Sequence, residues 1–226
     1  MAQSLGDSVF QEGFVSGILV PKVEDYITSL LPPRDRVLQD MERYAAHHDV
    51  PIIGPACGRL LYQLARLIQA RRVFELGSAI GYSTLWLGRA VGPQGTVFYT
   101  DSDPANARRA EDYLRRAGVL DRVRLLTGEA IQLFDSTDGE FDLVFNDINK
   151  TGYPSVFQRA IKRVRVGGLF ISDNVLRSGR VASRVASREA DTRAIQEFNR
   201  LIHSSRKLFT TVIPLRDGFA VCERLK

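Results

Sequence analysis

The chain has 226 residues, of which 44% are hydrophobic and 25% are charged, and its formal net charge is +5. This composition is typical of a globular protein with a full core; no apolar run approaches the roughly 20 residues of a membrane-spanning helix, and the N-terminus lacks the basic and apolar segments of a secretory signal. Two distant cysteines, Cys57 and Cys222, provide neither a disulfide framework nor a metal-binding spacing, which predicts a cytoplasmic protein.

Residues 1–70 contain no strand-like runs and are predicted to be helical. Apolar residues recur at helical spacing, with Pro32-Pro33 separating the first two stretches. The three predicted helices cover about residues 23–31, 37–44 and 58–69. We expect residues 1–57 to form a helical extension that acts as a lid or contacts a second subunit, and residues 58–226 to form the main domain.

From residue 71 onward, strand-like runs alternate with helical patterns. The predicted strands cover residues 72–77, 96–101, 122–128, 141–147 and 168–174. The predicted helices cover about residues 82–91, 104–117, 130–134, 153–164 and 190–204. Strands that are apolar at almost every position suit a sheet that is buried on both faces. The alternation therefore predicts right-handed β-α-β units and a doubly wound parallel sheet with helices on both faces.

The C-terminal stretch has a different pattern. Two strand-like runs, 208–215 and 218–225, are separated by a short turn around Asp217-Gly218. This pattern predicts an antiparallel hairpin that closes the sheet. The predicted fold is thus α/β, with a mostly parallel seven-stranded sheet, a reversed C-terminal strand and an N-terminal helical extension.

A glycine loop follows the first predicted strand, in 74-FELGSAIGYS-83. It lacks the GxGxxG pattern that holds a pyrophosphate, which argues against a nicotinamide dinucleotide. Glu75 would repel a pyrophosphate but suits a cationic, amine-bearing ligand, and Asp101 ends the second strand, where an acid can accept both hydroxyls of a ribose. Together they indicate S-adenosylmethionine (SAM). The alternative is that Gly77 and Gly81 are only tight-turn residues.

Polar residues end two further predicted strands. Asp147 ends the fourth strand, and Asp173 and Asn174 end the fifth. Because parallel neighbours lie roughly 4.8 Å apart, these side chains can converge on one ion. Such an all-oxygen set predicts a divalent cation, Mg²⁺ ahead of Mn²⁺ or Ca²⁺. The alternative is that each residue is an ordinary turn former at a strand end.

Lys150 follows Asp147 by three residues, and the pair has two interpretations. It is either a surface salt bridge or part of a reaction centre, with Asp147 and Lys150 as the catalytic residues. A bound cation would stabilise the oxyanion of a phenol, whose pKa is about 10, and two adjacent hydroxyls could chelate it. The expected acceptor is therefore a hydroxylated aromatic, catechol-like small molecule, from which Lys150 would take the proton.

Six motifs, in this order and spacing, resemble the cation-dependent O-methyltransferase family, which includes caffeoyl-CoA and catechol O-methyltransferases. They are ELGSAIGYS, TDSDP, GEA, FNDINK, GGLFISDN and PLRDGFAVC. The resemblance covers about residues 20–225. It implies a class I methyltransferase domain over 58–226 and a homodimer.

The resemblance also implies residue roles. Its donor-binding set comprises Ile53, Glu75, Gly77, Ser78, Ser83, Asp101, Ala130, Asp147 and Asn149. Asp147, Asp173 and Asn174 would bind the divalent cation, and Lys150 would assist deprotonation of the acceptor. The chain departs from the family at Asn149, which stands where an acid commonly contacts the donor. Since asparagine can still accept a hydrogen bond, we expect donor binding to weaken rather than vanish.

An arginine-rich segment follows the predicted metal residues. Residues 177–207 carry seven arginines and Lys207 against three acids. The segment is either a solvated helix face or a patch for an anionic partner such as RNA. Three functions stay open: methylation of a catechol-like small molecule, which is the leading one, methylation of a hydroxylated uridine in tRNA, and non-catalytic SAM binding.

Overall fold

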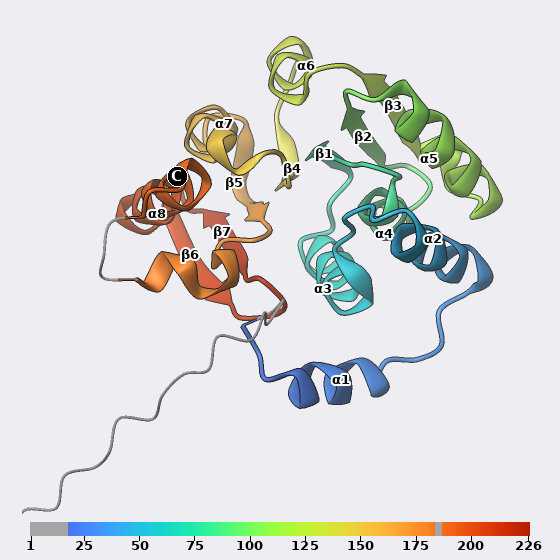
Figure 1. Ribbon diagram of the computed structural model, residues 1–226. Coiled ribbons are helices and arrows are strands. Elements are labelled where there is room, and N and C mark those ends of the chain that lie inside the picture. Colours follow the sequence, from blue (N-terminus) through green and yellow to red (C-terminus); the bar gives the residue numbers. More distant parts are fainter. Residues whose placement is uncertain (1–17, 184–186) are drawn as a thin grey trace, which may run out of the picture.

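The computed structural model describes residues 18–183 and 187–226 (Figure 1). It contains a seven-stranded sheet with the strand order β3-β2-β1-β4-β5-β7-β6. The strands are β1 (Arg72–Leu76), β2 (Thr96–Asp101), β3 (Val123–Thr127), β4 (Phe141–Asn146), β5 (Val164–Ser172), β6 (Leu208–Ile213) and β7 (Phe219–Arg224). Strands β1 to β5 are parallel, whereas β7 runs antiparallel to both β5 and β6. The predicted sheet and its reversed C-terminal strand are confirmed.

Helices cover both faces of the sheet. They are α1 (Pro21–Ser29), α2 (Arg36–His47), α3 (Gly54–Leu67), α4 (Tyr82–Ala90), α5 (Pro104–Arg116), α6 (Ala130–Ser136), α7 (Tyr153–Ala160) and α8 (Ala190–Ser204). The described residues also form short 3-10 helices, η1 (Leu120–Arg122), η2 (Lys150–Gly152) and η3 (Arg177–Ala182). Among the described helices, none combines the length and apolarity needed to span a bilayer.

Side chains of the strands alternate between two hydrophobic cores. Val73 and Leu143 belong to the core covered by α3, α4 and α5, whereas Phe74 and Val144 belong to the core covered by α6, α7 and α8 (Figure 1). Successive strand residues point to opposite faces, so a sheet buried on both faces needs apolar residues at nearly every position. This explains the uninterrupted apolar runs of the sequence.

The described part of the N-terminal extension is helical, as predicted. Helix α2 begins after Asp35, whose side chain accepts hydrogen bonds from the amides of Val37 and Leu38 and caps the helix. Helix α1 buries none of its residues. The predicted helix 58–69 begins earlier, at Gly54, so α3 continues across residue 57 into the main domain. The division of the chain at residue 57 stays a prediction.

The start of β5 differs from the prediction. The strand begins at Val164 rather than 168, and α7 ends at Ala160. The pairing of β4 with β5 shifts between Phe141 and Leu143, and Gly167 in this region has φ of 73°. A bulge of this kind adds residues to one strand and is not visible as an alternation of polar and apolar residues.

Candidate functional site

A cleft of about 950 Å³ lies at the carboxyl ends of the parallel strands. The loops after β1 to β5, the segment 49–52 and the turn between β6 and β7 line it. Open α/β sheets bind ligands at this edge, where the connections diverge. The predicted site residues that line the cleft are Gly77, Asp101, Ala130, Asp147, Asn149, Lys150, Asp173 and Asn174. The other predicted residues are buried around it: Ile53, Glu75, Ser78 and Ser83.

The glycine loop after β1 needs the conformational freedom of Gly77. This residue has φ of 82°, and a Cβ atom added to it would lie 2.7 Å from the carbonyl oxygen of Asp147. The loop is tied to β2, because the amide of Ser78 donates to the carbonyl of Thr100 over 2.9 Å. Only glycine therefore allows the ends of β1 and β4 to approach closely at the floor of the cleft.

Glu75 lies behind this loop and is fully buried. The hydroxyl of Thr84 donates to its Oε2, while Oε1 has no hydrogen-bond partner among the described residues. Burial raises the pKa of Glu75 to about 7, although nearby hydroxyls lower it. Through Thr84, the carboxyl anchors the start of α4 to β1. A direct contact of this carboxyl with the cationic methyl donor stays a prediction.

Asp101 is held in a fixed orientation at the end of β2. Its Oδ2 accepts from the amide of Ala79 over 3.0 Å, and its Oδ1 accepts from the amide of Asp103 over 2.8 Å and from Asn106 Nδ2 over 3.2 Å. A carboxylate offers about four lone-pair positions, so these bonds leave capacity for a ribose hydroxyl.

Asp147 and Asp173 follow neighbouring strands directly. The amide of Asp147 donates to Leu76, and that of Asp173 donates to Asn146, so the hydrogen-bond ladder continues beyond the assigned strands. Burial raises the pKa of Asp147, against the positive charge of Lys150. Burial and then the charge of Asp147 raise the pKa of Asp173 to about 7. Two carboxylates in this position resist ionising together unless a cation compensates them.

The oxygen donors at this edge are of the type that a hard divalent cation prefers. Within 18–183 and 187–226, no cluster of three or more His, Cys, Asp and Glu side chains is placed to hold a metal. The predicted set consists instead of two carboxylates and the amide of Asn174, which has φ of 56°. An all-oxygen set of this size suits Mg²⁺, which usually keeps several water ligands. The left-handed backbone, which asparagine tolerates, is common at functional sites.

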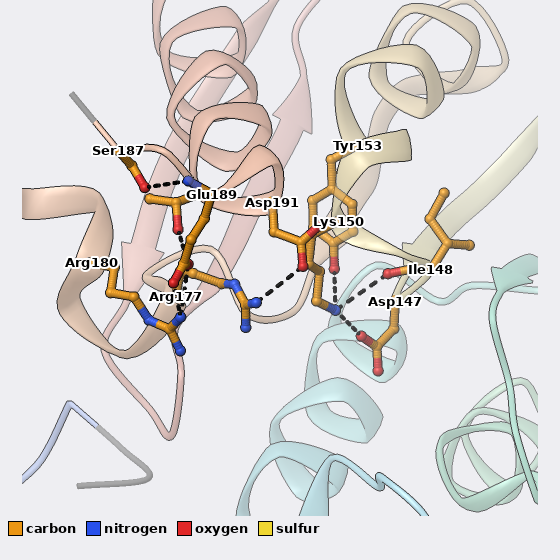
Figure 2. A network of polar contacts seen from close by, with 10 residues as sticks. Asp147, Ile148, Lys150, Tyr153, Arg177, Arg180, Ser187, Glu189 and Asp191 are labelled. Carbon is orange, nitrogen blue, oxygen red and sulfur yellow. Dashed lines mark hydrogen bonds and ion pairs between the residues drawn. The ribbon is translucent and has the colours of Figure 1, made fainter. Parts of the chain in front are cut away.

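Lys150 lies just after β4 and contacts Asp147, Ile148 and Tyr153 (Figure 2). Its Nζ lies 2.8 Å from Asp147 Oδ1, 3.3 Å from the carbonyl of Ile148 and 3.0 Å from the hydroxyl of Tyr153. Tyr153 in turn donates to the carbonyl of Asp173 over 2.9 Å. The salt bridge between Lys150 and Asp147 that was considered from the sequence is thus present and partly buried. Together, the three contacts of Nζ use all three donors of an ammonium group.

The arginine-rich segment forms ion pairs with the start of α8 (Figure 2). Arg177 lies 3.0 Å from Asp191, and Arg180 lies 2.8 Å from Glu189. Arg184 is outside the described residues. These two pairs engage two of the segment's arginines with acids of the same chain, which favours the interpretation of the segment as a solvated helix face over that of an RNA-binding patch, although Arg177 also lines the cleft.

Sequence reasoning missed Arg216 in the turn between β6 and β7. Arg216 has φ of 51°, and its guanidinium donates to the carbonyl of Ile52 over 2.5 Å. Both residues line the cleft, although they are 164 positions apart. The sequence signals the turn through Asp217-Gly218, but no pattern indicates that the preceding side chain faces the site.

Known proteins are similar to this chain over nearly its whole length. The sequence profile of the O-methyltransferase family matches residues 29–225. The chain belongs to the O-methyltransferase family. It is therefore an enzyme that transfers the methyl group of SAM to an oxygen acceptor.

Among relatives of this O-methyltransferase are two bacterial catechol O-methyltransferases. The one of Niastella koreensis is 34% identical over 210 residues, which are 88% of this chain and 95% of the relative. The one of Mycobacterium tuberculosis is 35% identical over 209 residues, which are 89% and 94% of the two chains.

Solved structures agree with the sequence comparison. An O-methyltransferase of Bacillus cereus in complex with SAH has a TM-score of 0.82 and 29% identity, covering 91% of this chain and 97% of that one. An O-methyltransferase of Streptomyces achromogenes in complex with SAM has a TM-score of 0.83 and 30% identity, covering 91% and 96%. The class I fold and SAM as the methyl donor follow from these similarities.

The raised pKa of Asp173 predicts that the metal-free enzyme is less stable at higher pH. Its pKa is about 7 in the folded chain against an ordinary value of 3.8, so the unfolded chain releases the proton first as the pH rises through this window. The free energy of unfolding should fall by about 1–3 kcal/mol between pH 5 and pH 8. Denaturant titration with a chelator present measures it.

Asp173→Asn removes this ionisation, so the free energy of unfolding should fall less steeply between pH 5 and pH 8. The variant should therefore be more stable than the original protein at pH 8. Asp112→Asn, at an exposed carboxylate of α5, is the matched control and should leave the slope unchanged. A free energy of unfolding that stays level or rises from pH 5 to pH 8 would contradict the assignment.

Proposed function

We propose that the enzyme methylates one hydroxyl of a catechol-like small molecule, with a divalent cation held by Asp147, Asp173 and Asn174. The observation that carries this proposal is the pair of carboxylates, Asp147 and Asp173, at adjacent strand ends beside the glycine loop, with Lys150 in contact with Asp147. Two relatives named catechol O-methyltransferase support the same class of acceptor.

The donor would bind at the β1 to β3 side of the cleft. Asp101 and Ala130, which line the cleft, would contact the ribose and the adenine, and Gly77 would keep the glycine loop close to Asp147 at the floor. Asp147 and Asn149, at the end of β4, would complete the donor site. Four further residues are buried and would support the walls of the donor site instead of lining its surface: Ile53, Glu75, Ser78 and Ser83.

The chain's own groups would orient the acceptor and receive its proton. A bound divalent cation would supply Lewis acidity, which lowers the pKa of an acceptor hydroxyl. Lys150 would take the proton at Nζ as a neutral amine, so its ammonium group has to release a proton to solvent and its ion pair with Asp147 has to open first. Tyr153 would hold the amine in place, because burial and the two aspartates keep the pKa of its hydroxyl well above 10 and the group stays protonated. Transfer then requires mainly the alignment of oxygen, methyl group and sulfur.

A small molecule is better supported as the acceptor than a tRNA base. The relatives named for a substrate act on catechol or caffeoyl-CoA, and the arginines Arg177 and Arg180 already pair with acids of the same chain. The cytoplasmic location predicted from two unpaired cysteines stays a prediction, and both thiols are buried.

Removal of divalent metal should abolish methyl transfer to a catechol acceptor, and Mg²⁺ should restore it. Mg²⁺ should also raise the melting temperature at pH 8, and Asp147→Asn with Asp173→Asn should remove this effect, because the carboxylates are the ligands. Transfer assays in excess chelator measure the loss of activity, and thermal unfolding with and without Mg²⁺ measures the change in melting temperature. Full activity in excess chelator would rule out the role of the cation.

Lys150→Met should lower kcat by about 10²- to 10⁴-fold if the amine takes the acceptor proton, with little change in the KM for SAM. The loss should be smaller for 4-nitrocatechol, which ionises more readily than catechol. Steady-state kinetics with both acceptors test this, with Lys162→Met at an exposed position as the control. An equal loss for both acceptors would indicate that Lys150 only supports the structure through Asp147.

We also propose that the enzyme is a homodimer in which α1 contacts the second copy. Helix α1 buries none of its residues, and Val23, Tyr26 and Leu30 are 45%, 63% and 64% exposed. Apolar side chains gathered on one helix suit an interface better than water. Light scattering should give twice the mass of one chain, and Tyr26→Asp with Leu30→Asp should halve it. A single-chain mass at all concentrations would refute the dimer.

A further inference from the structure

Two arginines line the end of the cleft where the acceptor would lie. Arg177 follows β5, and Arg216 precedes β7. Arg216 has no ion pair with any carboxylate within the described residues, and its one side-chain hydrogen bond there goes to the carbonyl of Ile52. A guanidinium has five N–H donors, so Arg216 keeps several for a ligand. Arg177 shares its charge with Asp191, while its Nε has no partner among the described residues.

The loops that carry these arginines lie side by side. The amides of Val175 and Leu176 donate to the carbonyls of Gly218 and Asp217 over 3.1 and 2.9 Å. A Cβ atom on Gly218 would lie 2.5 Å from the side chain of Leu176, so the two loops are closely packed. Both arginines are therefore attached to one rigid rim rather than to separate mobile loops.

Arg216 occupies a backbone conformation that favours glycine. Its φ is 51°, and Arg177 has a similar φ of 48°. Non-glycine residues in this region cost of order 1 kcal/mol or more, and they cluster at sites where the side chain has a function. Two long cationic side chains on strained residues of adjacent loops, both lining one cleft, indicate a ligand-binding role rather than turn formation.

The charges at the end of the cleft where the acceptor would lie also support a ligand-binding role for the arginines. Arg216 lines the same cleft as Asp147, Asp173 and Lys150, and among the described residues only Lys150 forms an ion pair with one of these aspartates. If a divalent cation compensates the two aspartates, as the proposed function requires, the charges of Lys150 and Arg216 are left in surplus. An ionised catechol compensates only one of them.

We propose that the acceptor is an aromatic vicinal diol that carries a carboxylate, and that Arg216, assisted by Arg177, binds this carboxylate. The planar guanidinium matches a carboxylate through two parallel hydrogen bonds, which makes it a specificity determinant and not only a counter-charge. This inference rests on the proposed function, because it names the substrate class of the same site.

The test compares two acceptors that differ in charge but hardly in shape, 3,4-dihydroxybenzoate and 3,4-dihydroxybenzamide, with the full chain, SAM and Mg²⁺. The kcat/KM should be about 10-fold or more higher for the acid. Arg216→Gly, which suits the left-handed backbone, should lower kcat/KM for the acid about 10- to 100-fold and for the amide by less than about 3-fold.

Variants of neighbouring residues complete the test. Arg216→Lys should retain part of the preference, and Arg177→Asn should reduce it less than Arg216→Gly does, because Asp191 already shares that charge. Arg180→Gln, in the same segment but paired with Glu189 away from the cleft, should leave both acceptors unchanged.

The outcomes separate the two proposals. Equal kcat/KM for the two acceptors, or equal losses for both in Arg216→Gly, would overturn the carboxylate assignment while leaving the methyltransferase assignment intact. Methyl transfer to neither acceptor would overturn the proposed catechol chemistry and the carboxylate assignment with it.

Discussion

The site depends on one electrostatic constraint, the placement of two carboxylates at adjacent strand ends in a partly enclosed cleft. Asp147 and Asp173 cannot both ionise there without compensation, and the described chain supplies it only in part, through Lys150 and Arg216. Two carboxylates in this position favour a bound cation, which is why the proposed function puts one at this edge of the sheet. The remaining features position groups around these two carboxylates.

The backbone explains how the constraint is maintained. The ladder continues past β4 and β5 through the amides of Asp147 and Asp173, so their Cα positions are fixed by the sheet itself. Gly77 admits the carbonyl of Asp147 at close range, and Tyr153 joins Lys150 to the backbone of β5. Groups held by the sheet and by a buried tyrosine are better preorganised than groups on free loops.

Much of the fold was predictable, because the parallel strands are largely apolar runs and three of them, β2, β4 and β5, lead into an aspartate at the same edge. That rule placed Asp101, Asp147 and Asp173 at the cleft. It did not show that Glu75 would be buried, although Glu75 lies two residues after Val73 and hence faces the same core. Arg216 could not be predicted, because its position depends on a turn that meets a segment far away in the sequence.

The strand order also separates two halves of the cleft. Loops after β1 to β3 form one side, loops around β5 to β7 form the other, and Asp147 on β4 lies between them. Substitutions in the rim formed by the loop after β5 and the turn before β7 thus leave the Gly77 loop and Asp101 untouched. With the donor on the first side and the acceptor on the second, as proposed, a lineage could exchange one acceptor for another through a few substitutions in this rim while its donor site is inherited unchanged.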